Sequence, residues 1–199
     1  MTVWTEHTLY DGEIAVPECL HWVDCVFERC KFVHAELRGL VTSGCQFIDC
    51  DFSGADMSEA RHENSSFVGC SMRATDLLGT RFTECRLTGT DFAGATLRGL
   101  RVERGDWSWV NLPAARLEKI DLRGVRLEGA YLANADLREA DLRETDLTGA
   151  TLSRSRVAGA DLRGATIESS DVHTLELREV RIDGAQALHI VEALGARID

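Results

Sequence analysis

Large apolar residues recur at every fifth position along most of this chain. The series begins at Trp22 and runs without a slip to Ile182, and of its 33 positions only Thr42 and His62 are not apolar. The residue two positions before each of them is small or apolar, and no Asp, Glu, Lys or Arg occupies either series. A period of five fits neither the 3.6-residue period of a helix nor the two-residue alternation of a strand.

The period is explained if each five-residue unit is a short extended side that ends in a turn. Four such sides close a square coil of about 20 residues, with the two apolar series inside and the other three positions facing solvent. Of the 17 glycines, 14 lie two positions after a large apolar residue, where a corner with positive φ favours glycine. The pattern therefore predicts an all-β solenoid of about eight coils, about 40 Å long, with residues twenty apart stacked in columns.

Segments such as CDFSGADMSEA, GTDFAGATLRG and AGADLRGAT are similar to the A(D/N)LXX signature of pentapeptide-repeat proteins. The resemblance covers residues 20–184 and implies the fold of that family, a right-handed quadrilateral β-helix. HWVDCVF near the start and VRIDGAQALHIVEALG near the end are similar to the mycobacterial fluoroquinolone-resistance members of the family. Related Qnr proteins carry loops that interrupt the coil, but the repeat phase never breaks here, so we expect a coil without such loops.

Three regions are expected along the chain. Residues 1–20 show no repeat and are expected to cap one end, residues 21–184 form the β-helix, and residues 185–199 form a short C-terminal α-helix. Leu188, Val191 and Leu194 fall on one helical stripe, with Ile190 alongside. In the resembled family such a helix joins two rods end to end, so these four residues predict a homodimer interface. A simple cap on a monomer is the alternative.

Charge limits the classes of partner. The 199 residues include 33 acids and 22 Lys or Arg, a formal net charge of −11, which argues against direct binding of nucleic acid. No apolar run approaches the roughly 18 residues that a membrane span needs, and no signal peptide is visible. We therefore expect a cytoplasmic protein without a membrane partner.

The residue types that could support chemistry have structural explanations. A column of three thiolates is conceivable, but the spacing lacks the paired cysteines of a zinc module, and stacked side chains point in parallel. Thr42 and His62 stack on adjacent coils and are expected to form a buried hydrogen-bonded pair. No nucleophile–base arrangement emerges, so we expect no enzyme activity, no metal and no cofactor. The cysteines in the small inward position, which we expect to serve packing, are Cys25, Cys30, Cys45, Cys50, Cys70 and Cys85.

Acidic residues on the solvent side also form columns. One column holds Glu36, Asp56 and Asp76, and a second holds Asp121, Asp141 and Asp161. Arginines two positions after the second group neutralise part of its charge, and arginines at 61, 81 and 101 continue that column with the opposite sign. The acids expected to bind a partner are Glu36, Asp56, Asp76, Asp121, Asp136, Asp141, Asp146 and Asp161.

The family resemblance implies what these columns do. Relatives bind DNA gyrase, a type II topoisomerase, and the resemblance implies competition with DNA, modulation of the enzyme and, in some settings, protection from quinolones or related poisons. A duplex 40 Å long carries about 23 charges, so a net charge of −11 is about half of that density. The leading hypothesis is a DNA mimic that binds gyrase. The alternative is a rigid β-helical interaction scaffold with a non-gyrase partner, its charge serving solubility.

Overall fold

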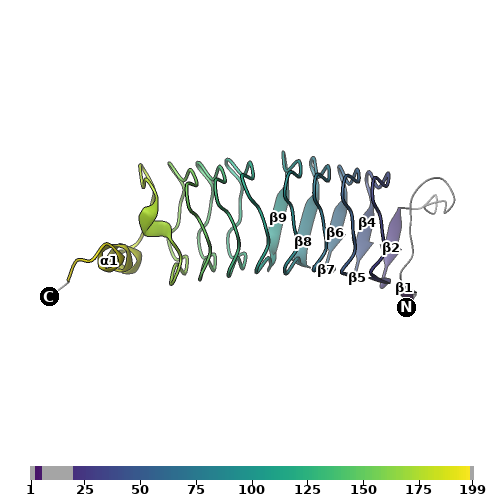
Figure 1. Cartoon of the computed structure of the whole chain (residues 1–199), viewed down its shortest axis with the longest axis horizontal. Helices are drawn as coiled ribbons and strands as arrows, with labels where there is room; N and C mark the ends of the chain where they lie inside the picture. The colour runs from purple at the N-terminus through teal and green to yellow at the C-terminus, as the bar shows by residue number, and fades with distance from the viewer. Residues whose placement is uncertain (1–2, 6–19, 198–199) are drawn as a thin grey trace.

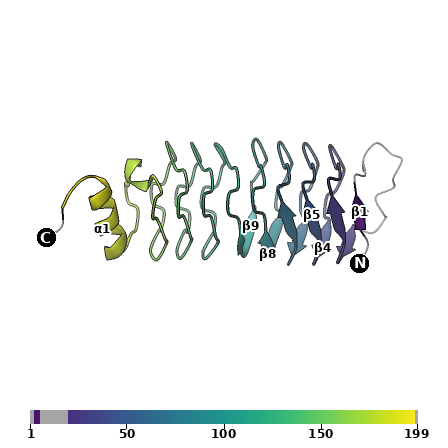
Figure 2. The ribbon, with the colours of Figure 1, turned by 60° about the horizontal axis from the view of Figure 1, so that its bottom comes forward.

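The computed structural model describes residues 3–5 and 20–197, and it forms a rod of stacked coils with the two termini at opposite ends (Figures 1 and 2). Most of the predicted N-terminal cap lies outside the described residues. A short 3-10 helix, η1, lies within the last coil, and the C-terminal helix, α1, follows it. The elements are β1 Val3–Thr5, β2 His21–Val23, β3 Val26–Glu28, β4 Val41–Ser43, β5 Gln46–Ile48, β6 Arg61–Glu63, β7 Ser66–Val68, β8 Arg81–Arg86, β9 Arg101–Asp106, η1 Val172–Thr174 and α1 Gly184–Ala193.

All described strands pair in parallel, with partners in neighbouring coils twenty residues apart from β2 onward. One face carries β2, β4, β6, β8 and β9, so that the register runs from His21 through Val41 and Arg61 to Arg101. Regular strands cover about four turns, and single-residue bridges with the same spacing continue to Arg181. The five-residue period therefore produces the predicted parallel β-solenoid, in which residues twenty apart form columns.

Each corner of the coil places one residue in the left-handed region of φ. Of the 14 glycines predicted at corners, 13 have φ between 63° and 75°. Gly184 is the exception, because it begins α1 instead of turning a corner. Eighteen non-glycine residues occupy the same phase with φ between 48° and 62°, among them Asp24 and Trp109. Parallel hydrogen bonds to the next coil hold these residues in a conformation that costs about 1–2 kcal/mol each.

The interior is filled by stacked layers of aromatic and aliphatic side chains. The Phe27 and Phe47 rings stack at 4.9 Å between centroids, and Phe47 stacks on Phe67 at 4.6 Å. The predicted polar pair is confirmed, because Thr42 Oγ1 lies 2.9 Å from His62 Nδ1 and both side chains are fully buried. The inward cysteines form no disulfide with one another; five are buried and the sixth, Cys25, is partly buried in the first coil.

The ladder of backbone hydrogen bonds has an interruption in the middle of the rod. Among the described residues, the N–H groups of Leu97, Gly99, Val102 and Arg104 have no partner, whereas the equivalent groups one coil earlier are bonded, for example Leu77 to the Thr96 carbonyl at 3.0 Å. We call this interruption, between residues 97–104 and 116–123, the seam. In Figure 1 the gap between the coil of β9 and the next coil toward the C-terminus is wider than the gap between the coils of β9 and β8.

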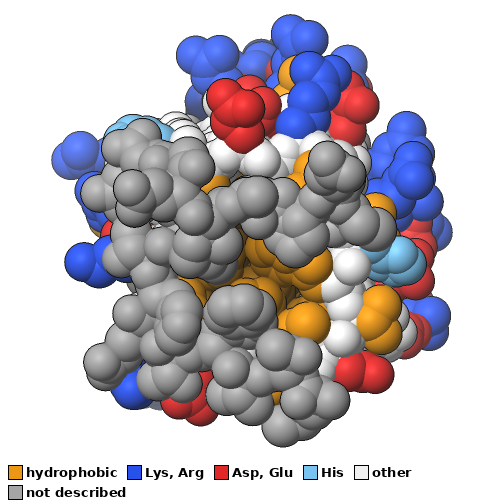
Figure 3. Space-filling view, turned by 90° about the vertical axis from the view of Figure 1, so that its right-hand side faces the viewer, with side chains coloured by type: hydrophobic (Ala, Val, Ile, Leu, Met, Phe, Trp, Pro, Cys, Tyr) orange, Lys and Arg blue, Asp and Glu red, His pale blue; other side chains and the backbone are white. Residues whose placement is uncertain are grey.

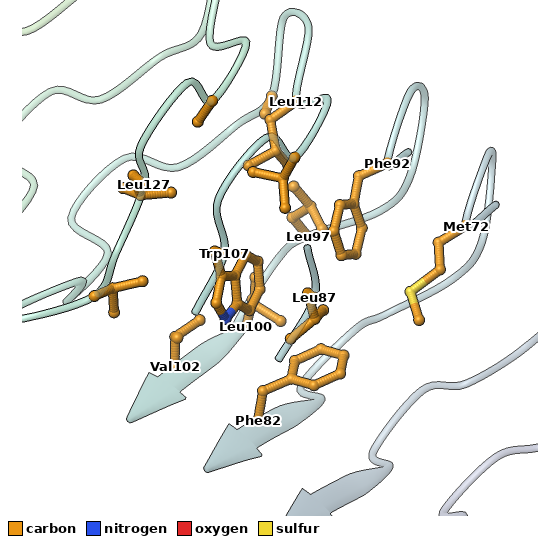
Figure 4. Packing of buried hydrophobic residues seen from close by; sticks show 14 of the residues in the cluster. Met72, Phe82, Leu87, Phe92, Leu97, Leu100, Val102, Trp107, Leu112 and Leu127 are labelled. Atoms are coloured by element: carbon orange, nitrogen blue, oxygen red, sulfur yellow. The ribbon is translucent and has the colours of Figure 1, made fainter. Parts of the chain in front are cut away.

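Two residues mark the coil at the seam. Gly105 is the one glycine on the small inward series, and a Cβ there would lie 2.3 Å from the Cys85 carbonyl oxygen, so only glycine permits the close pairing of β9 with β8. Trp107 replaces the usual leucine or phenylalanine and stacks on Phe92 at 5.6 Å (Figure 4). Its Nε1 is buried without a hydrogen-bond partner. One edge of β9 therefore packs closely against β8, while its other edge borders the seam.

Candidate protein-binding surface

The outward carboxylates are fixed by the local turn. The residue that opens each unit is directed away from the core, and where it is aspartate its side chain commonly accepts a hydrogen bond from the N–H group two residues later. Asp56 accepts from Ser58 N at 2.9 Å, and Asp76 accepts from Leu78 N at 3.0 Å. This Asx-type turn explains why aspartate recurs at the position, since its short side chain reaches its own backbone. The carboxylates are therefore positioned by the coil and repeat at its spacing.

The first acidic column, Glu36, Asp56 and Asp76, is free of salt bridges within the described residues. The three residues are bridged partners in successive coils, so their carboxylates rise by about 4.8 Å per step. A hydrogen bond from the Ser58 hydroxyl, at 2.6 Å, is the main cause that lowers the pKa of Asp56. The column presents three carboxylates without a salt-bridge partner among the described residues, although the nearby charge of Arg38 also lowers the pKa of Asp56.

The second acidic column is held by arginines, as the sequence predicted. Asp121, Asp141 and Asp161 are bridged partners, and each accepts from the arginine two residues later. The Nη2–Oδ2 distance is 2.6 Å in all three pairs, and Nε also donates to Oδ1. The hydrogen bond from Arg163 is the main cause that lowers the pKa of Asp161 to about 2. These carboxylates are ionised, but their charge is compensated locally.

The two remaining candidate acids are also paired. Asp136 accepts from Arg138 at 2.7 Å and lies 3.4 Å from Arg156, while Asp146 lies 3.6 Å from Arg126. The structure thus divides the eight candidates into three free carboxylates near the N-terminal end and five compensated ones in the C-terminal half. In the end-on view, charged side chains surround a hydrophobic centre (Figure 3).

Helix α1 docks on the last coil by contacts that the sequence did not reveal. Asp183 caps the helix by accepting from Gln186 N at 3.0 Å, and its other oxygen accepts from Gly164 N at 2.8 Å. The Gln186 amide donates to the Ala165 carbonyl at 2.8 Å. Ile190, expected at the dimer interface, is only 6% exposed and packs on the core of its own chain. The other predicted interface residues are exposed: Leu188, Val191 and Leu194.

Two exposed aromatic residues were missed by sequence reasoning. Trp109 is 62% exposed, and Tyr131 on the next coil is 45% exposed. The Trp109 ring covers Gly129, where an added Cβ would lie 2.5 Å from the ring. A tryptophan at a corner position, where glycine is the most frequent residue, was the available signal.

No metal-binding cluster or spanning helix is found among the described residues. No group of three or more His, Cys, Asp or Glu side chains there is placed to hold a metal ion. None of the described helices combines the length and apolar character that a bilayer span requires.

Comparison with known proteins identifies the repeat. Residues 41–112 match the family described as "Pentapeptide repeat region", and residues 130–168 match "Pentapeptide repeats (8 copies)". No curated protein sequence matches the chain.

Several solved structures share the fold. A trypsin-treated variant of QnrB1, described as a plasmid-mediated fluoroquinolone resistance protein, is 24% identical with a TM-score of 0.80, covering 100% of this chain and 98% of that chain. A second trypsin-treated variant has a TM-score of 0.75 at 24% identity, covering 100% and 99%. Full-length QnrB1 has a TM-score of 0.64 at 22% identity, with 98% of each chain covered.

Proposed function

We propose that this chain, a member of the pentapeptide-repeat family, is a non-catalytic protein that binds DNA gyrase at its DNA-binding surface in place of DNA. The observation that carries the proposal is the free acidic column of Glu36, Asp56 and Asp76 along the rod. Its rise of about 4.8 Å per carboxylate approaches the 3.4 Å per phosphate of one DNA strand. The shared fold with a fluoroquinolone resistance protein supports gyrase as the target. A gyrase-binding protein acts in the cytoplasm.

The free and compensated columns are expected to contribute unequally. Unpaired carboxylates attract the cationic DNA-binding surface over a distance that salt shortens, whereas a carboxylate held by arginine presents little net field. The five compensated acids contribute shape and hydrogen-bond acceptors rather than net charge. Binding should therefore weaken steeply with increasing salt, and most of that dependence should come from the free column.

A gyrase supercoiling titration, with and without a fluoroquinolone, tests the proposal. We expect the wild-type protein to inhibit supercoiling or to protect the enzyme from the drug. Changing Glu36→Gln, Asp56→Asn and Asp76→Asn together should raise the effective concentration about tenfold or more, since three rim charges each contribute about 0.5–1 kcal/mol. The amides keep the turn acceptor, so the coil should remain folded.

The matched control removes three carboxylates from the compensated column together with the arginines that hold them. Replacing Asp121, Asp141 and Asp161 by Asn and Arg123, Arg143 and Arg163 by Gln leaves the net charge unchanged, and we expect less than about a threefold effect. Equal losses in the two variants would contradict the special role of the free column. No effect of the wild-type protein on gyrase from its own host would remove gyrase as the target.

A second candidate function is a protein-interaction scaffold with a non-gyrase partner. The exposed aromatic pair, Trp109 and Tyr131, favours it, because exposed tryptophan and tyrosine commonly anchor protein interfaces. The two functions differ in competition with DNA. Duplex fragments should displace a DNA mimic from its partner, whereas a scaffold bound through Trp109 should lose its partner on Trp109→Ser and be indifferent to DNA.

The exposed face of α1 is proposed to join two chains. Leu188, Val191 and Leu194 present apolar surface at the C-terminal end of the rod, which a second copy would cover. Light scattering should give twice the mass of one chain, and Leu188→Glu with Val191→Glu should give a monomer. A wild-type mass equal to one chain would exclude the homodimer.

A further inference from the structure

A cationic column lies in the middle of the rod. Arg61, Arg81 and Arg101 are Cα partners in β6, β8 and β9, and the residue after each is buried, so the three arginine side chains leave the same face about 4.8 Å apart. Together with the corner residues that precede each of them, they line a groove of about 390 Å³. Small-molecule sites commonly have volumes of about 300–1,000 Å³.

The positive charge in the groove is only weakly compensated. Within the described part of the chain, Arg61 and Arg101 form no salt bridge, and the nearest acid to Arg81 is Glu103, at 3.8 Å. The one carboxylate that lines the groove, Glu59, is held by Arg38 at 2.5 Å. Glu63 follows Arg61 on the same strand and makes no salt bridge there. Three arginines therefore line a space in which the one lining carboxylate already has a partner.

Two glycines leave the groove floor without side chains. Gly79 and Gly99 have φ of 69° and 72°, and a Cβ added at Gly79 would meet nothing within 4 Å. The Gly79 N–H donates to the Arg98 carbonyl at 3.0 Å, but the Gly99 N–H lies at the seam and has no partner among the described residues. Unpaired backbone N–H groups beside cationic side chains are typical of anion-binding concavities. The seam thus supplies a donor that an unbroken ladder would have used.

We propose that this groove, henceforth the arginine groove, binds a compact oligophosphate, either inorganic or as the phosphate chain of a nucleotide. Guanidinium forks bind phosphate oxygens in bidentate fashion, and three of them match a short anion of high charge. An extended acidic peptide fits less well, because its side chains on one face repeat about every 6.6 Å, not every 4.8 Å. Duplex DNA is disfavoured by the net charge of −11 over the whole chain.

Titration calorimetry of the full chain with tripolyphosphate at about 50 mM salt tests the arginine groove. We expect binding tighter than about 1 mM, and Arg81→Gln or Arg101→Gln should weaken it about tenfold or more. The matched control is Arg86→Gln, which removes the same charge from β8 on a different face and should change affinity less than about threefold. Thermal unfolding of each variant confirms that the coil is intact.

A second pair of variants tests shape without changing charge. Gly79→Asn places a side chain in the groove at a φ that asparagine tolerates, and it should weaken binding about tenfold. Gly124→Asn occupies an equally open corner outside the groove and should have no effect. Equal loss in Arg86→Gln and Arg81→Gln, no loss in Gly79→Asn, or no binding at 1 mM would overturn the proposal.

Parallel titrations distinguish the sources of the anion. Adenosine triphosphate binding about tenfold tighter than tripolyphosphate would assign a nucleotide, and equal affinities would assign the phosphate chain itself. Tighter binding of a short duplex or of a poly-glutamate peptide would overturn the choice of a compact oligophosphate.

Discussion

The buried His62 makes folding stability depend on pH in a window where few other groups titrate. Its ring is fully buried, stacks on Phe82 at 4.8 Å, and has one hydrogen-bond partner, Thr42, while Nε2 has none. Burial lowers the pKa of His62 to about 3. An imidazolium in this column would lack both water and a counter-charge, so the folded chain keeps the ring neutral.

The sign and size of the effect follow from proton linkage. In the unfolded chain the histidine binds a proton near its ordinary pKa of about 6.5, whereas the folded chain binds it only near pH 3. Stability is therefore complete above pH 6.5 and is lost as the pH falls toward 3. Between pH 6.5 and 5, at 1.36 kcal/mol per pH unit, the loss is about 2 kcal/mol.

The assay is urea unfolding at pH 7, 6 and 5, comparing the wild-type chain with His62→Phe. The variant removes the titrating group and continues the aromatic stack, and Thr42 keeps Ser65 as a partner at 3.0 Å. We expect its midpoint to change little over this range, whereas the wild-type midpoint falls. His21→Gln, at an exposed site on the face of the coil that also carries His62, should retain the wild-type slope. Equal slopes in wild-type and His62→Phe would refute the reasoning.

Two further predictions concern the seam. Gly105→Ala should lower the free energy of unfolding by about 3 kcal/mol or more, since the added Cβ would lie 2.3 Å from a carbonyl oxygen. Gly39→Ala, with φ of 74° in open space, should cost about 1–2 kcal/mol. Thermal unfolding compares the two variants, and similar costs would contradict the close approach of β9 to β8. The Leu97 amide has no partner at the seam, whereas the Leu77 amide is hydrogen-bonded at 3.0 Å. The Leu97 amide should therefore exchange its hydrogen at least about tenfold faster than the Leu77 amide. Equal protection of the two amides would show that the seam is closed in solution.

The regular part of the fold was predictable because one physical requirement repeats in every unit. Each five-residue unit must contribute one large and one small side chain to the interior. This spacing determines the coil, its columns and the pairing of His62 with Thr42. The arginine forks on the second acidic column were predictable too, since a DLR triplet places both partners on one turn. Glycine predicted only some corners, because the ladder also holds residues such as Trp109 in left-handed geometry.

The seam was not predictable, because the hydrophobic series continues through it without a change of phase. Gly105 and Trp107 are acceptable members of their two series, and what they alter is the distance between coils. Sequence periodicity specifies which residues face inward but not the distance between successive coils. The free donor at Gly99 and the arginine groove depend on that closure, so only the coordinates reveal them.

The distribution of charge along the rod gives the proposed interaction a direction. The free acidic column begins in the coils nearest the N-terminus, the arginine groove overlaps its last coils and extends to the middle of the rod, and the compensated acids lie nearest α1. In a dimer joined through α1, the two free columns would lie at the outer ends and the neutralised acids beside the joint. Each end could then engage a partner independently, so separating the chains with Leu188→Glu should reduce avidity while leaving the affinity of a single end unchanged.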